Sequence, residues 1–266
     1  MARKYVLDRT ADFAKPNVAR MYDFYLGGHD NYPVDREACG ELLLRAPAQA
    51  LALAQQRFHR RAVQHLVAHH GIRQILDIGC GFPTGADAHH IAQGIARDVR
   101  VVYVDKDPMV VNHGRALLEG DGRTAVVQAD LRDTDGLFGE PRLSDLIDLD
   151  RPVAVLLVSV LHCVPDDADP VGCVRRILDR LPSGSCLALS HLASEDVEAA
   201  QAVSRFMRDA TEWGRVRPPH EVACFFDGLE ILPPGLGDVA LWHATGAGRG
   251  AARRGWFEHG GVARLP

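Results

Sequence analysis

The chain has 266 residues, 30 of them basic and 35 acidic, with a formal net charge of -5, 47% hydrophobic residues and 24% charged residues. This length allows one or two domains and a core that needs no disulfide or metal to hold it. An acidic chain with dispersed arginines lacks the concentrated cationic face of a dedicated nucleic-acid binder, so we expect no nucleic-acid partner. The longest apolar run, residues 152–161, is about half a membrane span, and the N-terminus lacks the apolar segment of a secretion signal. These features predict a cytoplasmic protein with no membrane partner.

Neither the cysteines nor the histidines predict a metal site. The six cysteines show no C-x-x-C spacing and lie in apolar or glycine-rich sequence, where a free cysteine behaves as a small hydrophobic residue. His65 and His69 are four residues apart on a predicted helix, and His89 and His90 are adjacent. Neither pair has an accompanying acidic or cysteine ligand, so we expect no metal.

The first 70 residues contain no strand-like run. Residues 17–26 predict a helix that ends at Gly27 and Gly28, and residues 46–70 predict a longer helix that ends at Gly71. No linker rich in Ser, Gly or Pro follows them. They therefore predict a helical cap or lid at residues 1–71 rather than an independent domain.

From residue 73 onward, compact apolar runs alternate with helical stretches. Several runs are almost continuous in Val, Leu and Ile, which is typical of strands buried on both faces of a parallel sheet. The predicted strands are residues 73–79, 99–105, 124–130, 152–159, 185–191, 229–234 and 238–245. The predicted helices between them are residues 86–97, 108–119, 170–181 and 195–213. This alternation predicts an α/β core at residues 72–245 with a Rossmann-like, doubly wound sheet of seven strands.

The end of the chain departs from this alternation. Too few residues separate the last two predicted strands for a crossover helix, so we expect these strands to pair antiparallel at the end of the sheet. Residues 246–266 are interpreted as an irregular tail that packs on the core.

The strongest local motif is ILDIGCGFPTG at residues 75–85, where the first predicted strand meets a helix. Gly79 and Gly81 let the backbone turn sharply and approach a ligand, and the helix N-terminus offers unpaired N–H groups. A dinucleotide fingerprint needs a third glycine where this chain has Thr84. The loop that binds S-adenosylmethionine instead has an acid before the glycines, as Asp77 is here. The loop alone fits a nucleotide site and a plain tight turn equally well.

Two more acids follow the second and third predicted strands. At the end of the second strand, the Asp105 carboxylate can accept hydrogen bonds from both ribose hydroxyls of an adenosine. At the end of the third, Asp130 can accept a bond from an adenine amino group while the N–H of Leu131 meets a ring nitrogen. A single aspartate of this kind is often only a turn former or a helix cap. Three acids after three successive strands predict one ligand-binding edge.

These motifs together resemble the class I S-adenosylmethionine-dependent methyltransferases, which share the glycine loop, the later acids and a final antiparallel strand. More narrowly, the sequence resembles the bacterial family named S-adenosyl methyltransferase, whose substrates are largely unknown. The resemblance extends from about residue 10 to the end of the chain. Its segments are PNVARMYDFYLGGHDNYPVDRE, ILDIGCGFPT, VVYVDKDPMVV, VVQADLRD, DRPVAVLLVSVLHCVPDD and EVACFFDGLEILPPGL.

The resemblance implies that S-adenosylmethionine binds at the carboxyl edge of the sheet. The cofactor-binding residues that it implies there are Asp77, Gly79, Cys80, Gly81, Asp105, Lys106, Asp130, Leu131, Val158 and Ser159. Val158 and Ser159 are expected to border the methyl donor. Two positions depart from the family pattern: His29 stands where lysine is usual, and Cys80 where a small or hydroxyl residue is common.

The segment LGGHDNY at residues 26–32 sets polar and aromatic groups beside two glycines, as a lid over a pocket would. Gly28, His29, Asp30 and Asn31 are therefore also predicted to contact the cofactor. The alternative is an exposed turn between two helices, in which Asp30 and Asn31 cap the second one.

Three residues are candidates for catalysis. His162 follows the fourth predicted strand, where a neutral imidazole could take a proton from a hydroxyl or amine as it is methylated. A histidine that merely holds a loop explains the position equally well. His191, at the end of the fifth strand, is a second candidate for the same role. Tyr22 lies on the first predicted helix, and its ring either packs in the core or faces the donor sulfonium.

The sequence therefore predicts a methyltransferase that uses S-adenosylmethionine on a small-molecule acceptor, because a cap folded over the pocket would exclude a duplex or a folded protein. Its main contribution would be to align acceptor and methyl in a dry site. Three alternatives stay open: a non-catalytic regulator that binds S-adenosylmethionine or S-adenosylhomocysteine, an enzyme that uses S-adenosylmethionine for other chemistry, and a nicotinamide-dependent oxidoreductase. Thr84 and the antiparallel ending count against the last. A homodimer is compatible with the sequence.

Overall fold

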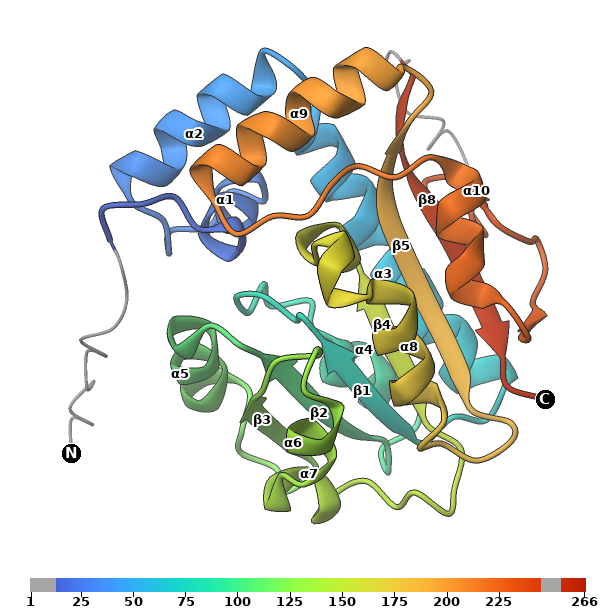
Figure 1. The fold of residues 1–266 in the computed structure, drawn as a ribbon. Coiled ribbons are helices and arrows are strands. Elements are labelled where there is room, and N and C mark those ends of the chain that lie inside the picture. Colours follow the sequence, from blue (N-terminus) through green and yellow to red (C-terminus); the bar gives the residue numbers. More distant parts are fainter. Residues whose placement is uncertain (1–12, 245–254) are drawn as a thin grey trace, which may run out of the picture.

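The structure is a computed structural model that describes residues 13–244 and 255–266. Its strands form one sheet in the order β3-β2-β1-β4-β5-β8-β6, with β7 also paired to β8 (Figure 1). The parallel strands are β1 (Gln74–Ile78), β2 (Arg100–Asp105), β3 (Thr124–Gln128), β4 (Ala154–Val158) and β5 (Cys186–Ser194). The antiparallel part consists of β6 (Glu230–Ile231), β7 (Gly237–Asp238) and β8 (Trp256–Arg264). The prediction of a Rossmann-like sheet with an antiparallel last strand is confirmed.

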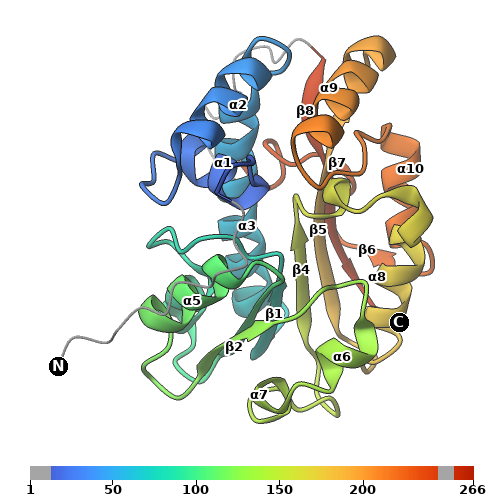
Figure 2. The same cartoon turned by 60° about the vertical axis from the view of Figure 1, so that its left-hand side comes forward.

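Helices cover both faces of the sheet, because its central strands are apolar on both sides (Figure 2). One face packs against α3 (Ala48–His69), α4 (Ala88–Ile95) and α5 (Pro108–Leu117). The other packs against α6 (Thr134–Phe138), α7 (Pro141–Ser144), α8 (Pro170–Leu178) and α10 (Pro219–Ala223). Each fully buried Val or Leu in these two layers contributes about 1.5–3 kcal/mol relative to an exposed position.

Three further helices lie above the carboxyl edge of the sheet: α1 (Val18–Tyr25), α2 (Pro33–Leu43) and α9 (Val197–Ala210) (Figure 1). With the beginning of α3 they enclose a third apolar cluster, which includes Met21, Tyr25 and Met207. Asn17 caps α1 by accepting a hydrogen bond from the Arg20 N–H. The predicted boundaries after residues 71 and 245 stay predictions. In the part of the chain that the structure describes, no helix is long and apolar enough to cross a membrane.

The end of the sheet differs from the prediction in two ways. Within the described residues 229–244, the two predicted strands do not pair with each other: the strand segments there are the dipeptides β6 and β7, and each pairs with β8, while residue 245 lies outside the described part of the chain. The apolar residues of 238–244 lie in turns, where Trp242 packs edge-on against Phe58 at 5.4 Å. The interpretation of residues 246–266 as an irregular tail is also wrong for Trp256–Arg264, which pairs with β5 along its whole length.

Gly260 explains how β8 fits beside β5. A Cβ at Gly260 would lie 1.9 Å from the Leu189 carbonyl oxygen and 2.8 Å from the Ser190 Cα, and neither backbone atom can move aside easily. We therefore expect Gly260→Ala to lower the free energy of unfolding by about 2–3 kcal/mol, as overpacking of a core does. The matched control is Gly237→Ala on β7, where a Cβ meets no atom within 4 Å. Chemical denaturation measures the free energy of unfolding of both variants. Equal losses would contradict the close approach of β8 to β5 at Gly260.

Candidate functional site

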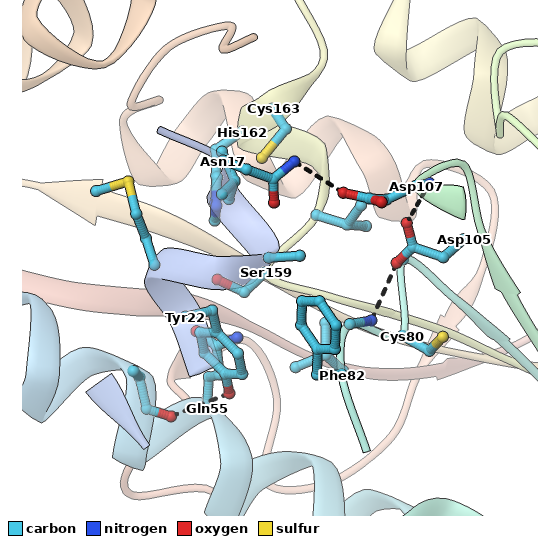
Figure 3. A pocket seen from close by; sticks show the side chains of 18 of the residues that line it. Asn17, Tyr22, Gln55, Cys80, Phe82, Asp105, Asp107, Ser159, His162 and Cys163 are labelled. Carbon is cyan, nitrogen blue, oxygen red and sulfur yellow. Dashed lines mark hydrogen bonds between the residues drawn. The ribbon is translucent and has the colours of Figure 1, made fainter. Parts of the chain in front are cut away.

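A cavity of about 340 Å³ opens at the carboxyl ends of β1, β2, β3 and β4 and continues beneath α1, α3 and α9 (Figure 3). This volume falls within the range of small-molecule sites. Among its lining residues are Tyr22, Asp77, Gly79, Cys80, Gly81, Asp105, Lys106, Asp130, Leu131, Val158, Ser159 and His162. The structure thus brings the catalytic candidates Tyr22, on α1, and His162, after β4, together with most of the predicted cofactor-binding residues.

The glycine loop is held against the end of β2. The N–H groups of Gly79 and Cys80 both donate to the Val104 carbonyl, at 2.8 and 3.2 Å. Gly79 and Gly81 have φ angles of 71° and 67°, in the left-handed region that favours glycine. At Gly79 the space is also closed, because a Cβ there would lie 2.4 Å from Val160 Cγ2. At these two glycines the loop therefore brings backbone to the cavity, while Cys80 and Phe82 add side chains beside them (Figure 3).

Asp105 lies beside this loop at the end of β2. Its Oδ2 accepts a hydrogen bond from the Gly81 N–H and its Oδ1 one from the Asp107 N–H, both at 3.0 Å (Figure 3). Burial raises the pKa of Asp105 to about 6, and the two N–H groups oppose that rise. The carboxylate is therefore ionised at neutral pH and fixed in position, as a group that accepts bonds from ribose hydroxyls must be.

Asp130 shares its end of the cavity with the predicted Lys106 and with two charged groups that the sequence did not single out, Arg132 and Glu212. Arg132 donates from Nε to both Asp130 oxygens, at 2.9 and 3.0 Å, and reaches Glu212 Oε1 at 3.1 Å. Lys106 Nζ lies 2.6 Å from Glu212 Oε2. Burial raises the pKa of Asp130, but the hydrogen bonds from Arg132 lower it by more, so the net shift is downward. Glu212 follows α9, so these ion pairs join that helix to the ends of β2 and β3.

Asp77 is buried in β1 and paired with a histidine. His59 Nε2, from α3, lies 2.9 Å from Asp77 Oδ2. Although burial lowers the pKa of His59, the Asp77 carboxylate raises it by more, so the net shift is upward. His59 also lines the cavity, and the sequence prediction missed it because eighteen residues and a helix separate the partners.

A buried carboxylate at the far end of the cavity was also missed. Glu258 on β8 is 2% exposed and lines the cavity. Its oxygens accept hydrogen bonds from the hydroxyls of Ser159, at 3.1 Å, and Ser190, at 3.0 Å. Ser159 directly follows β4 and has a φ of 60°, which is uncommon for a residue with a side chain. The only sequence signal was an acid within the alternating pattern WFEHGGV.

His162 is placed as predicted, but its surroundings favour a holding role over a base. Burial first, and then the charge of Arg217, lowers the pKa of His162 to about 3. Its Nδ1 accepts a bond from the Leu192 N–H at 3.4 Å, and its ring lies 4.4 Å from that of Trp213. An effective general base has a pKa near the working pH. The predicted role of His162 as a base stays a prediction.

His191 and Tyr22 are both held by hydrogen bonds. His191 is fully buried outside the lining of the cavity, where its Nδ1–H donates to the Leu192 carbonyl at 2.8 Å and its Nε2 accepts from Arg217 at 2.9 Å. The Tyr22 hydroxyl donates to the Ala52 carbonyl at 3.3 Å and bonds the Gln55 side chain (Figure 3). Burial, with the nearby Glu258 carboxylate, raises the pKa of Tyr22, so the phenol stays neutral.

Of the predicted lid segment, residues 26–32, only Leu26 lines the cavity. Gly28, His29, Asp30 and Asn31 are absent from the lining residues, and their contact with a cofactor stays a prediction. The segment instead folds back on Asp23, whose Oδ2 accepts from the Asp30 N–H and the Asn31 Nδ2, both at 2.8 Å. The alternative that Asp30 and Asn31 cap the next helix is wrong, because the N-cap of α2 is Tyr32.

The described lining of the cavity is acidic. Its carboxylates are Asp77, Asp87, Asp105, Asp107, Asp130, Glu212 and Glu258, and its Lys and Arg residues are Lys106 and Arg132. A cavity of this charge attracts cations and repels anions. Within the described residues, no group of three or more His, Cys, Asp and Glu side chains is arranged to hold a metal ion.

The sheet order, the glycine loop after β1 and the acids after β2 and β3 define a class I methyltransferase. The chain belongs to the S-adenosyl methyltransferase family, whose model matches residues 5–266. It is therefore a methyltransferase, and its cofactor is S-adenosylmethionine.

Solved structures agree with this assignment. A DUF574 family protein from Streptomyces avermitilis is 41% identical, with a TM-score of 0.91, and the match covers 96% of this chain and 99% of that one. A putative methyltransferase from Thermobifida fusca is 36% identical, with a TM-score of 0.88 and 96% of each chain covered. The mitomycin 7-O-methyltransferase, 18% identical with a TM-score of 0.51 over 80% of this chain and 55% of its own, shares the fold. No curated protein matches the sequence.

Proposed function

We propose that this protein transfers the methyl group of S-adenosylmethionine to a small molecule enclosed beneath α1 and α9. The observation that carries the proposal is that a single cavity continues from Asp130 and Asp105 to residues of α1 and α9, such as Tyr22 and Met207. Asn17, at the start of α1, donates from Nδ2 to Asp107 Oδ2 at 2.8 Å and so ties this helix to the end of β2 (Figure 3). We call α1, α2 and α9, the three helices above the carboxyl edge of the sheet, the roof of the cavity. A duplex or a folded protein does not fit beneath this roof.

The residues of the cavity suit the parts of the cofactor. In the proposal, Asp105 accepts bonds from the ribose hydroxyls, Asp130 and the Leu131 N–H meet the adenine, and the glycine loop faces the methionine end. The cofactor supplies a methyl group on a sulfonium, which is reactive without activation. The protein contributes alignment of the acceptor and exclusion of water, and the acidic lining favours the sulfonium cation.

Calorimetry and product analysis test this function. We expect the purified protein to bind S-adenosylmethionine and S-adenosylhomocysteine but not NAD. With labelled S-adenosylmethionine, label should pass to compounds in a small-molecule extract and not to tRNA, DNA or protein. Efficient transfer to one of these macromolecules, or product masses that show a group other than methyl, would contradict the proposal.

The compartment and the oligomeric state complete the proposal. The six cysteines are unpaired in the structure, which agrees with the reducing cytoplasm as the place where the protein works. A homodimer stays a prediction, which sedimentation or light scattering can decide.

A further inference from the structure

The strand order leaves one end of the cavity to the acceptor. Asp130, Asp105 and Gly79 lie at the carboxyl ends of β3, β2 and β1, which are neighbours in the sheet, and Ser159 follows the next strand, β4. Glu258 belongs to β8, two strands beyond β4, and yet lines the same cavity. An adenosine that spans β3, β2 and β1 leaves Glu258 on the opposite side of the methyl donor.

Glu258 is held in a defined position at this end. It is 2% exposed, and one serine hydroxyl donates to each of its oxygens: Ser159 from the end of β4 and Ser190 from β5. Ser159 reaches it from a left-handed backbone conformation with a φ of 60°, and such strain persists where the surroundings impose it, often at functional sites. The two hydroxyl donors, one on each oxygen, hold the carboxylate in this position.

Another part of the cavity wall is apolar. Met21 from α1, Leu192 from β5, Met207 from α9 and Trp213 line the cavity and are at most 8% exposed. A site of this kind takes a molecule with an apolar body and one polar group that the carboxylate can bind. The ligand group that best matches a buried carboxylate is a cation that donates hydrogen bonds.

We propose that Glu258 binds the amine of the methyl acceptor, and that this acceptor is a small apolar molecule with a primary or secondary amine. The proposal deepens the proposed function and rests on it. The amine enters as an ammonium and passes one proton to Glu258. The freed lone pair forms a bond to the methyl carbon while the carbon–sulfur bond breaks and its electrons stay on sulfur. The products are a methylated ammonium and neutral S-adenosylhomocysteine, and Glu258 then loses its proton to water.

Binding of amines to the protein saturated with S-adenosylhomocysteine tests this assignment. The probes are 2-phenylethylamine, tryptamine and octylamine, each paired with the alcohol of the same carbon skeleton. By calorimetry, we expect at least one amine to bind more tightly than its alcohol. Glu258→Gln should weaken the binding of that amine roughly 10- to 100-fold, as the loss of a hydrogen bond to a charged group does. The affinity for the alcohol should stay unchanged. Ser190→Ala removes one of the two hydroxyls that hold the Glu258 carboxylate, so it should weaken the binding of the same amine about threefold.

The control variant is Glu230→Gln, an exposed carboxylate on β6, which should change neither ligand. S-adenosylhomocysteine should bind wild type, Glu258→Gln and Ser190→Ala alike. If S-adenosylhomocysteine binds neither wild type nor the two variants, the proposed function fails. If it binds wild type but no amine exceeds its alcohol, or if both variants keep the preference for the amine, the acceptor class is wrong and the proposed function stands. Weaker binding of S-adenosylhomocysteine to Glu258→Gln would place the carboxylate on the cofactor and overturn the inference.

Discussion

Asp105→Ala is expected to weaken the binding of S-adenosylmethionine by about 100-fold. Two ribose hydroxyls would lose a charged acceptor, and each hydrogen bond to a charged group is worth about 1.5–3 kcal/mol. The N–H groups of Gly81 and Asp107 would lose their acceptor as well, so the glycine loop would no longer be fixed to the end of β2. Calorimetric titration with S-adenosylmethionine measures the change.

The matched control is Asp98→Ala, just before the same strand, where the carboxylate is 74% exposed and pairs with Arg73. It should bind the cofactor like wild type. Equal affinities for Asp105→Ala and Asp98→Ala would remove Asp105 from the cofactor site.

The pH dependence of binding is a second check on Asp105. Since burial raises the pKa of Asp105 to about 6 in the folded protein, the affinity for S-adenosylmethionine should rise between pH 5 and 7 and then level off. The stability of the ligand-free protein changes in the opposite sense. The contribution of Asp105 is fully present below the pKa of an unfolded aspartate, about 3.9, and is lost as the pH rises through 6. Asp105→Asn should abolish both trends.

The five parallel strands were predictable because their signals are local. Continuous Val, Leu and Ile runs mark strands buried on both faces, and Pro108 or Gly79 marks where a helix or turn begins. For the same reason, the acids at the ends of three predicted strands could be assigned to one edge of the sheet from the sequence alone. Asp77, Asp105 and Asp130 line one cavity because parallel strands end on the same side.

The other end of the cavity depends on contacts between distant residues. The strand β8 has glycines where a core strand usually has apolar side chains, since only glycine fits against the Leu189 carbonyl. Glu258 therefore stood in a short alternating segment interrupted by glycines, 99 residues from its partner Ser159. Residues 238–244 have the apolar pattern of a strand, but they form turns, and Trp242 is buried by packing on α3. No local pattern distinguishes these cases.

The buried ion pair between α1 and α2 is expected to contribute most to the stability of the roof. Arg20 Nε lies 2.7 Å from Asp35 Oδ2, with the side chains 3% and 0% exposed. Asp35 also accepts hydrogen bonds from the N–H groups of Asn17 and Tyr32, both at 2.9 Å. Asp35→Ala would leave the Arg20 charge buried and unpaired, so we expect a loss of about 3–5 kcal/mol in the free energy of unfolding. Chemical denaturation measures it.

An exposed ion pair at the end of α2 provides the control. Arg45 and Glu41 are 37% and 56% exposed, and an exposed pair of this kind contributes about 0–1 kcal/mol, so Glu41→Ala should change little. The double variant Arg20→Met with Asp35→Leu should regain part of the loss, because it leaves no buried charge. The recovery should be incomplete, since the N–H groups of Asn17 and Tyr32 still lack an acceptor. If Asp35→Ala cost no more than Glu41→Ala, the pair would not hold α1, and the tie from Asn17 to Asp107 would have to fix the roof alone.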